Sequence, residues 1–188
     1  MLPADWPSRL ERFGRLRQGQ NARLKRLEDL VGATLALALL AGPLGLALLL
    51  LLLQGHRVRL LREPRLGLET VPLALPWLAV EPQPPRWWRR SGLERMPALL
   101  TVLRGELALV GPRPLPPAPA EQAAALDPAF AMRFWVKPGL LRWSPGRSQA
   151  LARPQGPLDE LPEDLCYLSN WSPWLDISCL AGRLLGRR

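Results

Sequence analysis

The chain has 188 residues, which is enough for one modest domain and too few for two ordinary ones. Its formal net charge of +9 favours anionic partners such as lipid head groups, phosphorylated substrates or nucleic acid. The 22 prolines limit long helices and break up sheets, so we expect a soluble part that is rich in loops. The cysteines, Cys166 and Cys179, predict neither a disulfide framework nor a zinc ribbon.

A basic segment, residues 1–29, precedes an uncharged run of mostly leucine and alanine, residues 30–53. As one helix, the 24 residues of this run would reach about 36 Å, which is enough to cross a hydrocarbon core of about 30 Å. The charged stretch before it is too long for a cleaved signal peptide. We therefore expect the apolar segment to be retained in the membrane.

Both ends of the apolar run carry basic residues, so both ends favour the cytoplasmic side. Gly42 and Pro43 lie near its middle, and each half alone, at about 15 to 20 Å, is too short to span a bilayer. The pattern favours a re-entrant helix-break-helix. A single crossing is the alternative, because a proline break at depth must find partners for its freed carbonyl groups.

We expect residues 54–188 to form one cytoplasmic α/β domain in which helices predominate. Residues 66–90 predict a connector rich in proline and tryptophan, and the apolar spacing over residues 92–104 predicts an amphipathic helix that Gly105 ends. Residues 107–110 predict a short buried strand, and the alanine-rich residues 117–132 predict a helix. The tail, residues 164–188, predicts an amphipathic helix that lies either on an anionic membrane surface or on the core.

The predicted strand runs into Gly111, Pro112, Arg113 and Pro114. Two prolines fix the backbone and Gly111 permits close approach, so Arg113 is presented on a rigid loop. A guanidinium held in this way suits bidentate phosphate binding, and pairing with a carboxylate such as Glu106 is the alternative.

A second basic patch covers residues 133–147, with Trp135 and Trp143 between the cations. Tryptophan among cations can stack on nucleic-acid bases, but it is also typical of membrane interfaces. Because an apolar segment is present, we expect anionic membrane lipids as partners and no nucleic acid. The acidic residues Asp29, Asp164 and Asp176 are expected as helix caps, surface charges or structural ion pairs, without a catalytic role.

Several motifs together, in the same order, resemble the bacterial sugar transferase family, which comprises monotopic polyprenyl-phosphate phosphoglycosyl transferases. They are Lys25-Arg26-Leu-Glu-Asp29, Arg62-x-x-Arg65-Leu-Gly67, the stretch from Pro97 to Pro114 that ends in Gly-Pro-Arg-Pro, Val136-Lys-Pro138-Gly139, and the stretch from Asp164 to Asp176. The resemblance implies a re-entrant helix with a break like Pro43 and interfacial amphipathic helices. It places a small α/β domain on the cytoplasmic face of the inner membrane.

The resemblance also implies an activity, which is transfer of a sugar-1-phosphate from a nucleotide (UDP-) sugar to polyprenyl phosphate, initiating exopolysaccharide or other glycan synthesis. In the family, an Asp attacks the β-phosphate of the UDP-sugar and releases UMP, and the adjacent Glu helps to hold Mg²⁺. By this resemblance Arg113, Arg133 and Arg147 would bind the diphosphate.

This chain departs from the family at the acidic pair. Alignment back from Pro97 places Glu94 at the nucleophilic Asp and Arg95 at the metal-associated Glu. Glu94 is therefore the candidate catalytic residue, although moving a reactive atom by about 1 Å can lower a rate about 100-fold. Arg95 would repel Mg²⁺ or replace part of its charge, which leaves Glu94 and Glu106 as possible metal ligands.

A second departure lies near residues 77–79, where Trp-Leu-Ala replaces the family's Lys-Phe-Arg. Two hypotheses follow from these departures. The chain is either a transferase that uses Glu94, or a catalytically inactive member that serves as a lipid-phosphate-binding scaffold or as the partner of an active transferase. The sugar, the polyprenol and the oligomeric state are left open.

Overall fold

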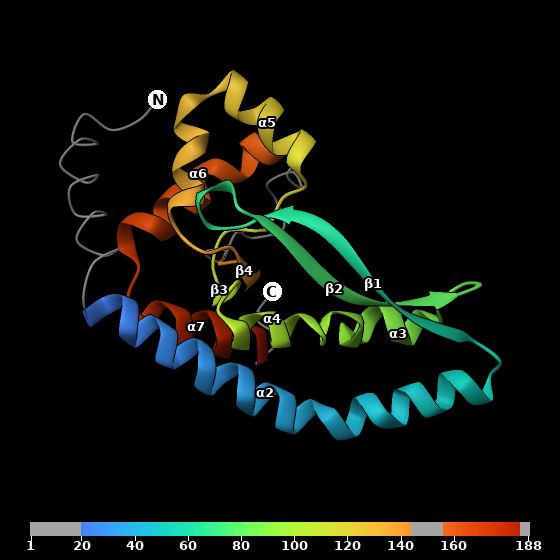
Figure 1. Ribbon diagram of the computed structural model, residues 1–188. Coiled ribbons are helices and arrows are strands. Elements are labelled where there is room, and N and C mark those ends of the chain that lie inside the picture. The colour runs from blue at the N-terminus through green and yellow to red at the C-terminus, as the bar shows by residue number, and fades with distance from the viewer. Residues whose placement is uncertain (1–19, 144–155, 185–188) are drawn as a thin grey trace.

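A computed structural model describes residues 20–143 and 156–184 of the chain. Helix α2 (Gln20–Leu53) contains the whole apolar run and includes Pro43 without ending there. Figure 1 shows that the helix changes direction near its middle. Among the described residues, one helix is long and apolar enough to cross a membrane, over Ala22–Leu53. The helix begins well before the apolar run, so residues 20–29 of the basic segment are part of it.

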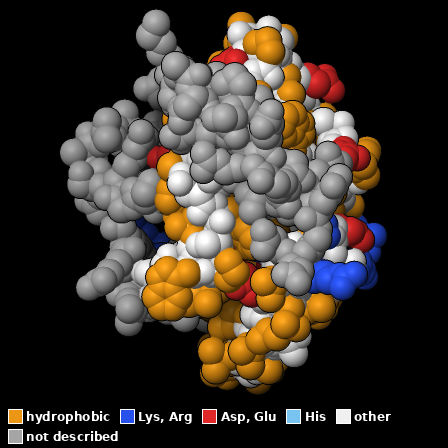
Figure 2. Space-filling view, turned by 90° about the vertical axis from the view of Figure 1, so that its left-hand side faces the viewer, with side chains coloured by type: hydrophobic (Ala, Val, Ile, Leu, Met, Phe, Trp, Pro, Cys, Tyr) orange, Lys and Arg blue, Asp and Glu red, His pale blue; other side chains and the backbone are white. Residues whose placement is uncertain are grey.

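Most of the leucine side chains of α2 remain exposed. In Figure 2, apolar side chains gather over the lower part of the molecule, where α2 lies in Figure 1. Large apolar side chains more than 40% exposed on α2 are Leu24, Leu27, Val31, Leu35, Leu39, Leu46, Leu49, Leu50, Leu52 and Leu53. A continuous exposed apolar surface of this kind is typical of a site of contact with lipid or protein.

Residues 57–81 form a β-hairpin, so the segment 66–90, expected from the sequence as a connector rich in proline and tryptophan, contains a strand. Strand β1 (Arg57–Leu66) pairs antiparallel with β2 (Pro72–Glu81) along its whole length, around a 3₁₀ turn at Leu68–Thr70. Pro64 and Pro76 lie inside the strands. They are tolerated because each strand of a two-stranded ribbon has one unpaired edge, toward which the missing N–H can face.

The hairpin leads into the helical part of the domain. Its elements are α3 (Arg86–Ser91), a 3₁₀ turn η2 (Leu93–Arg95), α4 (Ala98–Arg104), β3 (Ala108–Val110), α5 (Pro117–Leu126), η3 (Pro128–Trp135) and β4 (Gly139–Leu141). The chain then continues through α6 (Pro157–Asn170) and α7 (Pro173–Leu184). The described strands form two small sheets, and helices predominate, as expected for a helix-dominated α/β protein.

The local predictions in this region are confirmed in part. The expected helix over 92–104 is divided into η2 and α4, and Gly105 ends it in the left-handed conformation, with φ of 88°. The predicted strand is β3. The helix predicted over 117–132 ends at Leu126, and a separate 3₁₀ segment, η3, follows from Pro128. The single helix predicted for the tail is instead two helices, α6 and α7.

A buried cluster of polar groups ties α2 to the rest of the domain. The ammonium group of Lys25 lies 3.0 Å from Asp29 and 2.6 Å from Asp176 of α7. The backbone N–H of Leu109 in β3 donates to Asp29 at 2.8 Å, and the hydroxyl of Tyr167 donates to Asp176 at 2.9 Å. Both aspartates are 3% exposed, so they form structural ion pairs rather than surface charges.

Strands β3 and β4 pair in parallel and meet at two glycines. The N–H of Gly111 donates to Leu141 O at 3.0 Å, and the N–H of Gly139 donates to Pro112 O at 2.8 Å. A Cβ atom on Gly139 would lie 2.1 Å from the backbone nitrogen of Gly111. The two segments can therefore approach this closely only because both positions lack a side chain.

We predict that Gly139→Ala lowers the free energy of unfolding by about 3 kcal/mol, because the new methyl group must push β4 away from the Gly-Pro-Arg-Pro loop. Thermal unfolding of the detergent-solubilised protein would measure the change. Gly45→Ala is the matched control, since a Cβ at this helical position meets nothing within 4 Å. Equal melting temperatures for the two variants would contradict the close contact.

Candidate active site

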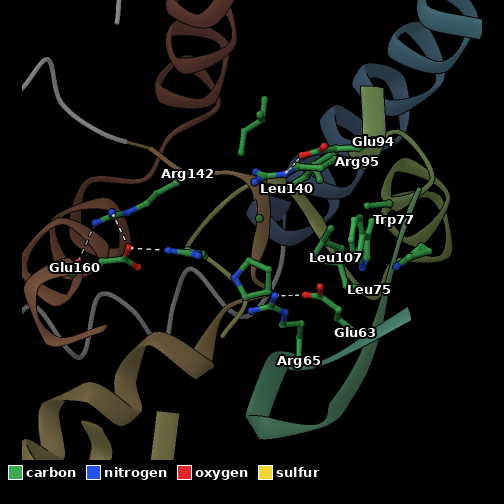
Figure 3. Close-up of a pocket in the computed structure, with 16 residues that line it drawn as sticks. Glu63, Arg65, Leu75, Trp77, Glu94, Arg95, Leu107, Leu140, Arg142 and Glu160 are labelled. Atoms are coloured by element: carbon green, nitrogen blue, oxygen red, sulfur yellow. Dashed lines mark hydrogen bonds and ion pairs between the residues drawn. The ribbon is translucent and has the colours of Figure 1, made fainter. Parts of the chain in front are cut away.

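The domain contains a cavity of about 580 Å³ between the hairpin, η2 and the β3–β4 sheet. Its charged lining residues are Glu63, Arg65, Glu94, Arg95, Arg113, Arg142 and Glu160. Four arginines against three glutamates leave the lining formally with one excess positive charge. Figure 3 shows Glu94 and Arg95 on one side of this cavity, and Arg142 and Glu160 on the other.

The candidate catalytic residue, Glu94, lines the cavity from the 3₁₀ turn η2. Gly92 precedes this turn in the left-handed conformation, with φ of 71°, and so redirects the chain from α3 toward the cavity. The side chain of Glu94 is 26% exposed, and it faces the guanidinium of Arg95 at 4.0 Å. Arg95 itself is 71% exposed, so solvent weakens this ion pair. Glu94 is therefore a carboxylate that a ligand can reach.

The predicted phosphate ligand Arg113 also lines the cavity, with its side chain 60% exposed. It pairs with Glu160 of α6 at 3.4 Å, rather than with Glu106, the carboxylate considered from the sequence. Glu160 is 4% exposed and also lies 3.3 Å from Arg142, the residue that directly follows β4. One buried carboxylate thus holds two cavity arginines, and the exposed one, Arg113, can turn to an anion at little cost.

Arg133 lies beneath the cavity and is not among its lining residues. It is 2% exposed, pairs with Asp164 at 3.0 Å and donates to the backbone carbonyl of Arg113 at 2.9 Å. Burial is the main cause that lowers the pKa of Arg133, and Asp164 opposes this effect. This geometry gives Arg133 a positioning role, because it fixes the backbone that carries Arg113.

The motif residues surround the same region. Pro114 and Gly139 line the cavity, Pro112 and Pro138 are buried beside them, and Pro43 lies apart in α2. Arg147, the third predicted phosphate ligand, lies outside the described residues.

Sequence reasoning misses four charged residues of the cavity, which are Glu63, Arg65, Arg142 and Glu160. Arg142 belongs to the predicted basic patch, and its place directly after a strand could have marked it as facing a site. Arg65 comes from β1, a strand that the sequence does not predict, and it pairs there with Glu63. On the other strand, Trp77, at a position where the sequence resemblance implies a cation, also lines the cavity.

These features agree with a comparison against known protein families, in which the family described as bacterial sugar transferase matches residues 83–185 of this chain. The chain belongs to the bacterial sugar transferase family. The resemblance inferred from the sequence motifs is thereby confirmed.

Several named bacterial proteins are similar to this bacterial sugar transferase. The UDP-glucose:undecaprenyl-phosphate glucose-1-phosphate transferase of Escherichia coli K12 is 30% identical over 184 residues, which cover 85% of this chain and 39% of that protein. The protein of the same name from Caulobacter vibrioides is 30% identical over 177 residues, covering 81% and 65%. The chain therefore spans less than two thirds of the length of these relatives.

A divalent metal is generally expected in a sugar-phosphate transferase, but the residues of this cavity do not fit one. Within residues 20–143 and 156–184, no group of three or more His, Cys, Asp or Glu side chains is arranged to hold a metal ion. Glu63, Glu94 and Glu160 each face an arginine. The other acid considered as a ligand, Glu106, is exposed and is not among the lining residues.

A pH dependence of stability is expected from Asp164, the buried partner of Arg133. Burial is the main cause that raises the pKa of Asp164 from 3.8 to about 6, although Arg133 and Arg142 oppose the rise. Because the folded pKa exceeds the unfolded one, the neutral side chain stabilises the fold below about pH 4, and this contribution is lost as the pH rises through about 6.

We therefore predict that Asp164→Asn, which cannot ionise, gains stability relative to wild type as the pH rises from about 4.5 to about 7. Melting temperatures of both proteins across this range would measure the relative change. Glu121→Gln, on the exposed face of α5, is the control and should follow wild type throughout. A difference between Asp164→Asn and wild type that stays constant with pH would contradict the shifted pKa.

Proposed function

We propose that this chain transfers a sugar-1-phosphate from a UDP-sugar to polyprenyl phosphate at a membrane, a step that initiates exopolysaccharide or other glycan synthesis. The observation that carries the proposal is a reachable carboxylate, Glu94, in an arginine-lined cavity of a bacterial sugar transferase. The relatives named above act on UDP-glucose and undecaprenyl phosphate, by their names.

The proposed reaction is a double displacement at one phosphorus atom. A carboxylate oxygen of Glu94 attacks the phosphorus that carries the sugar, the bond to the bridging oxygen breaks, and UMP leaves with that oxygen. A phosphate oxygen of the lipid then attacks the same phosphorus, which releases the carboxylate and forms a polyprenyl diphosphate sugar. Arg113 binds the phosphate oxygens and stabilises the charge that develops on them.

The contacts of α2 support a re-entrant placement in the membrane. Ala33 in the first half of the helix packs with Leu99 of α4, and Leu51 near its end packs with Trp88 of α3. These two contacts lie about 27 Å apart along the helix axis, close to the thickness of a hydrocarbon core. A straight crossing would place parts of one small domain on opposite sides of the bilayer, so we propose that α2 enters and leaves on the cytoplasmic face.

This placement also defines the proposed surroundings of the protein. The exposed leucines of α2 would lie in the cytoplasmic leaflet of the inner membrane, and exposed basic residues near its two ends, such as Arg23 and Arg57, would contact anionic lipids. The domain formed by residues 54–188 would then lie on the cytoplasmic side, where it meets both a soluble nucleotide sugar and the phosphate of a membrane lipid.

We predict that Glu94→Gln lowers UMP release by roughly 1000-fold or more, because an amide cannot form the covalent phosphosugar intermediate. The measurement uses purified protein in nanodiscs with undecaprenyl phosphate and a panel of UDP-sugars. Mass spectrometry of the wild-type protein with UDP-sugar alone should find the added sugar-phosphate on the peptide that contains Glu94.

The matched control for this assay is Glu121→Gln, an exposed position on α5 that should retain wild-type release. Release that continues in Glu94→Gln would move the nucleophile to another group. Wild-type protein that binds lipid phosphate but releases no UMP with any sugar would contradict the transferase function and support an inactive scaffold.

The re-entrant placement predicts that both ends of α2 lie on the same side of the membrane. Cysteines introduced separately at Ala22 and Gln54, with Cys166 and Cys179 changed to serine, should both react with an impermeant maleimide in inverted vesicles and neither in intact spheroplasts. Glu121→Cys marks the side of the domain in the same experiment. Reaction of the two helix ends from opposite sides would establish a single crossing.

A further inference from the structure

The charged groups of the cavity differ from those of a metal-dependent phosphate site in one respect. Each lining carboxylate already faces a guanidinium: Glu63 pairs with Arg65, Glu94 with Arg95, and Glu160 with Arg113 and Arg142. A divalent cation in this cavity would have to displace an arginine and then remain beside its positive charge. Mg²⁺ sites at phosphates instead use one or two carboxylates that are available for binding.

Arg95 occupies the position from which a cation could act on a ligand at Glu94. The two residues are adjacent in the turn η2, and both line the cavity. The ion pair between them is long, at 4.0 Å, and the Arg95 side chain is 71% exposed. Such a pair contributes little, so the guanidinium can leave Glu94 and bind a phosphate with two parallel hydrogen bonds.

Arg113 gives the cavity a second mobile cation on another wall. It is 60% exposed and belongs to the rigid Gly-Pro-Arg-Pro loop, whose backbone Arg133 fixes from below. Arg142, in contrast, is 17% exposed and bound among the carboxylates of α6. Two exposed guanidinium groups thus face one space, and a diphosphate bears enough oxygens to accept hydrogen bonds from both.

We propose that Arg95 supplies the positive charge that a divalent metal ion would otherwise bring to the substrate diphosphate, so that this cavity binds nucleoside diphosphates without a metal. The inference rests on the proposed function, because it assumes that a nucleotide sugar is the ligand. It assigns Arg95 to diphosphate binding beside the nucleophile. Arginine is effective in this role, since a positioned guanidinium stabilises charge on a transferring phosphoryl group.

Titration calorimetry with UDP as the probe tests the proposal, using the full chain in nanodiscs. Wild type should bind UDP in EDTA, and added Mg²⁺ should change the affinity by less than about 3-fold. Arg95→Ala should weaken binding in EDTA by about 10-fold or more, which is the loss expected for one charge-assisted pair. Arg95→Glu, which provides two adjacent carboxylates, should bind UDP only when Mg²⁺ is present.

Arg104→Ala is the matched control, because Arg104 is an exposed arginine of α4 that does not line the cavity. It should bind UDP as wild type does. Melting temperatures establish that all variants are folded. The proposal is overturned if EDTA abolishes wild-type binding, if no UDP binds in either buffer, or if Arg95→Ala and Arg104→Ala bind equally well.

Failure of this inference can be distinguished from failure of the proposed function. Binding that requires Mg²⁺, together with UMP release from UDP-sugars, would overturn the role of Arg95 and leave the transferase standing. Metal-independent UDP binding that depends on Arg95, without UMP release, would support the inference and contradict the transfer reaction.

Discussion

The ammonium group of Lys25 lies between two buried carboxylates, Asp29 on α2 and Asp176 on α7. Removing one member would leave an uncompensated charge in the interior, at a cost of about 3 to 5 kcal/mol, so each of the three groups fixes the other two. The cluster extends further because Leu109 donates to Asp29 and Tyr167 donates to Asp176. The apolar helix, the strand that leads to the Gly-Pro-Arg-Pro loop and the last helices are therefore positioned by one set of contacts. In the proposed membrane placement, this cluster would also make the height of the cavity above the lipid depend on the depth of α2.

The arginines around the cavity differ in how readily a ligand can replace their carboxylate partners. Arg133 is buried, pairs with Asp164 and donates to the backbone carbonyl of Arg113, so it serves as a fixed support for the loop. Arg113 and Arg95 belong to exposed pairs, which contribute little and exchange partners readily. The same residue type thus acts in two ways, and burial decides which. An excess of one positive charge in the cavity is then sufficient to bind a diphosphate, since the diphosphate can replace carboxylates as the partner of the exposed arginines.

Local signals in the sequence predict the elements whose causes are local. Gly105 ends a helix because it can adopt a positive φ, and the apolar run forms a helix through composition alone. The hairpin is not predictable in this way, because its prolines argue against strands until it is known that both strands have an unpaired edge. The burial of Arg133 depends on Asp164, which a distant helix supplies, so the sequence shows a basic patch where the fold has a structural ion pair. Motif order identifies the family, but only the fold shows which arginines face the cavity.

Glu94 and Arg95, at the positions where the sequence resemblance implies two acids, have a simple consequence for charge. Two carboxylates with one bound divalent cation carry no net charge, and neither do Glu94 and Arg95 together. A diphosphate that arrives at this wall of the cavity therefore meets a neutral pair in both cases. The difference lies in the bonds that form next: a metal binds phosphate oxygens directly and holds the carboxylates in place, whereas a guanidinium donates hydrogen bonds and must leave its carboxylate to do so. In the proposed binding mode, Arg95 turns toward the phosphate, and Glu94 would lose its counter-ion at the moment when a nucleophile is needed. Binding of the substrate would thus expose the attacking group.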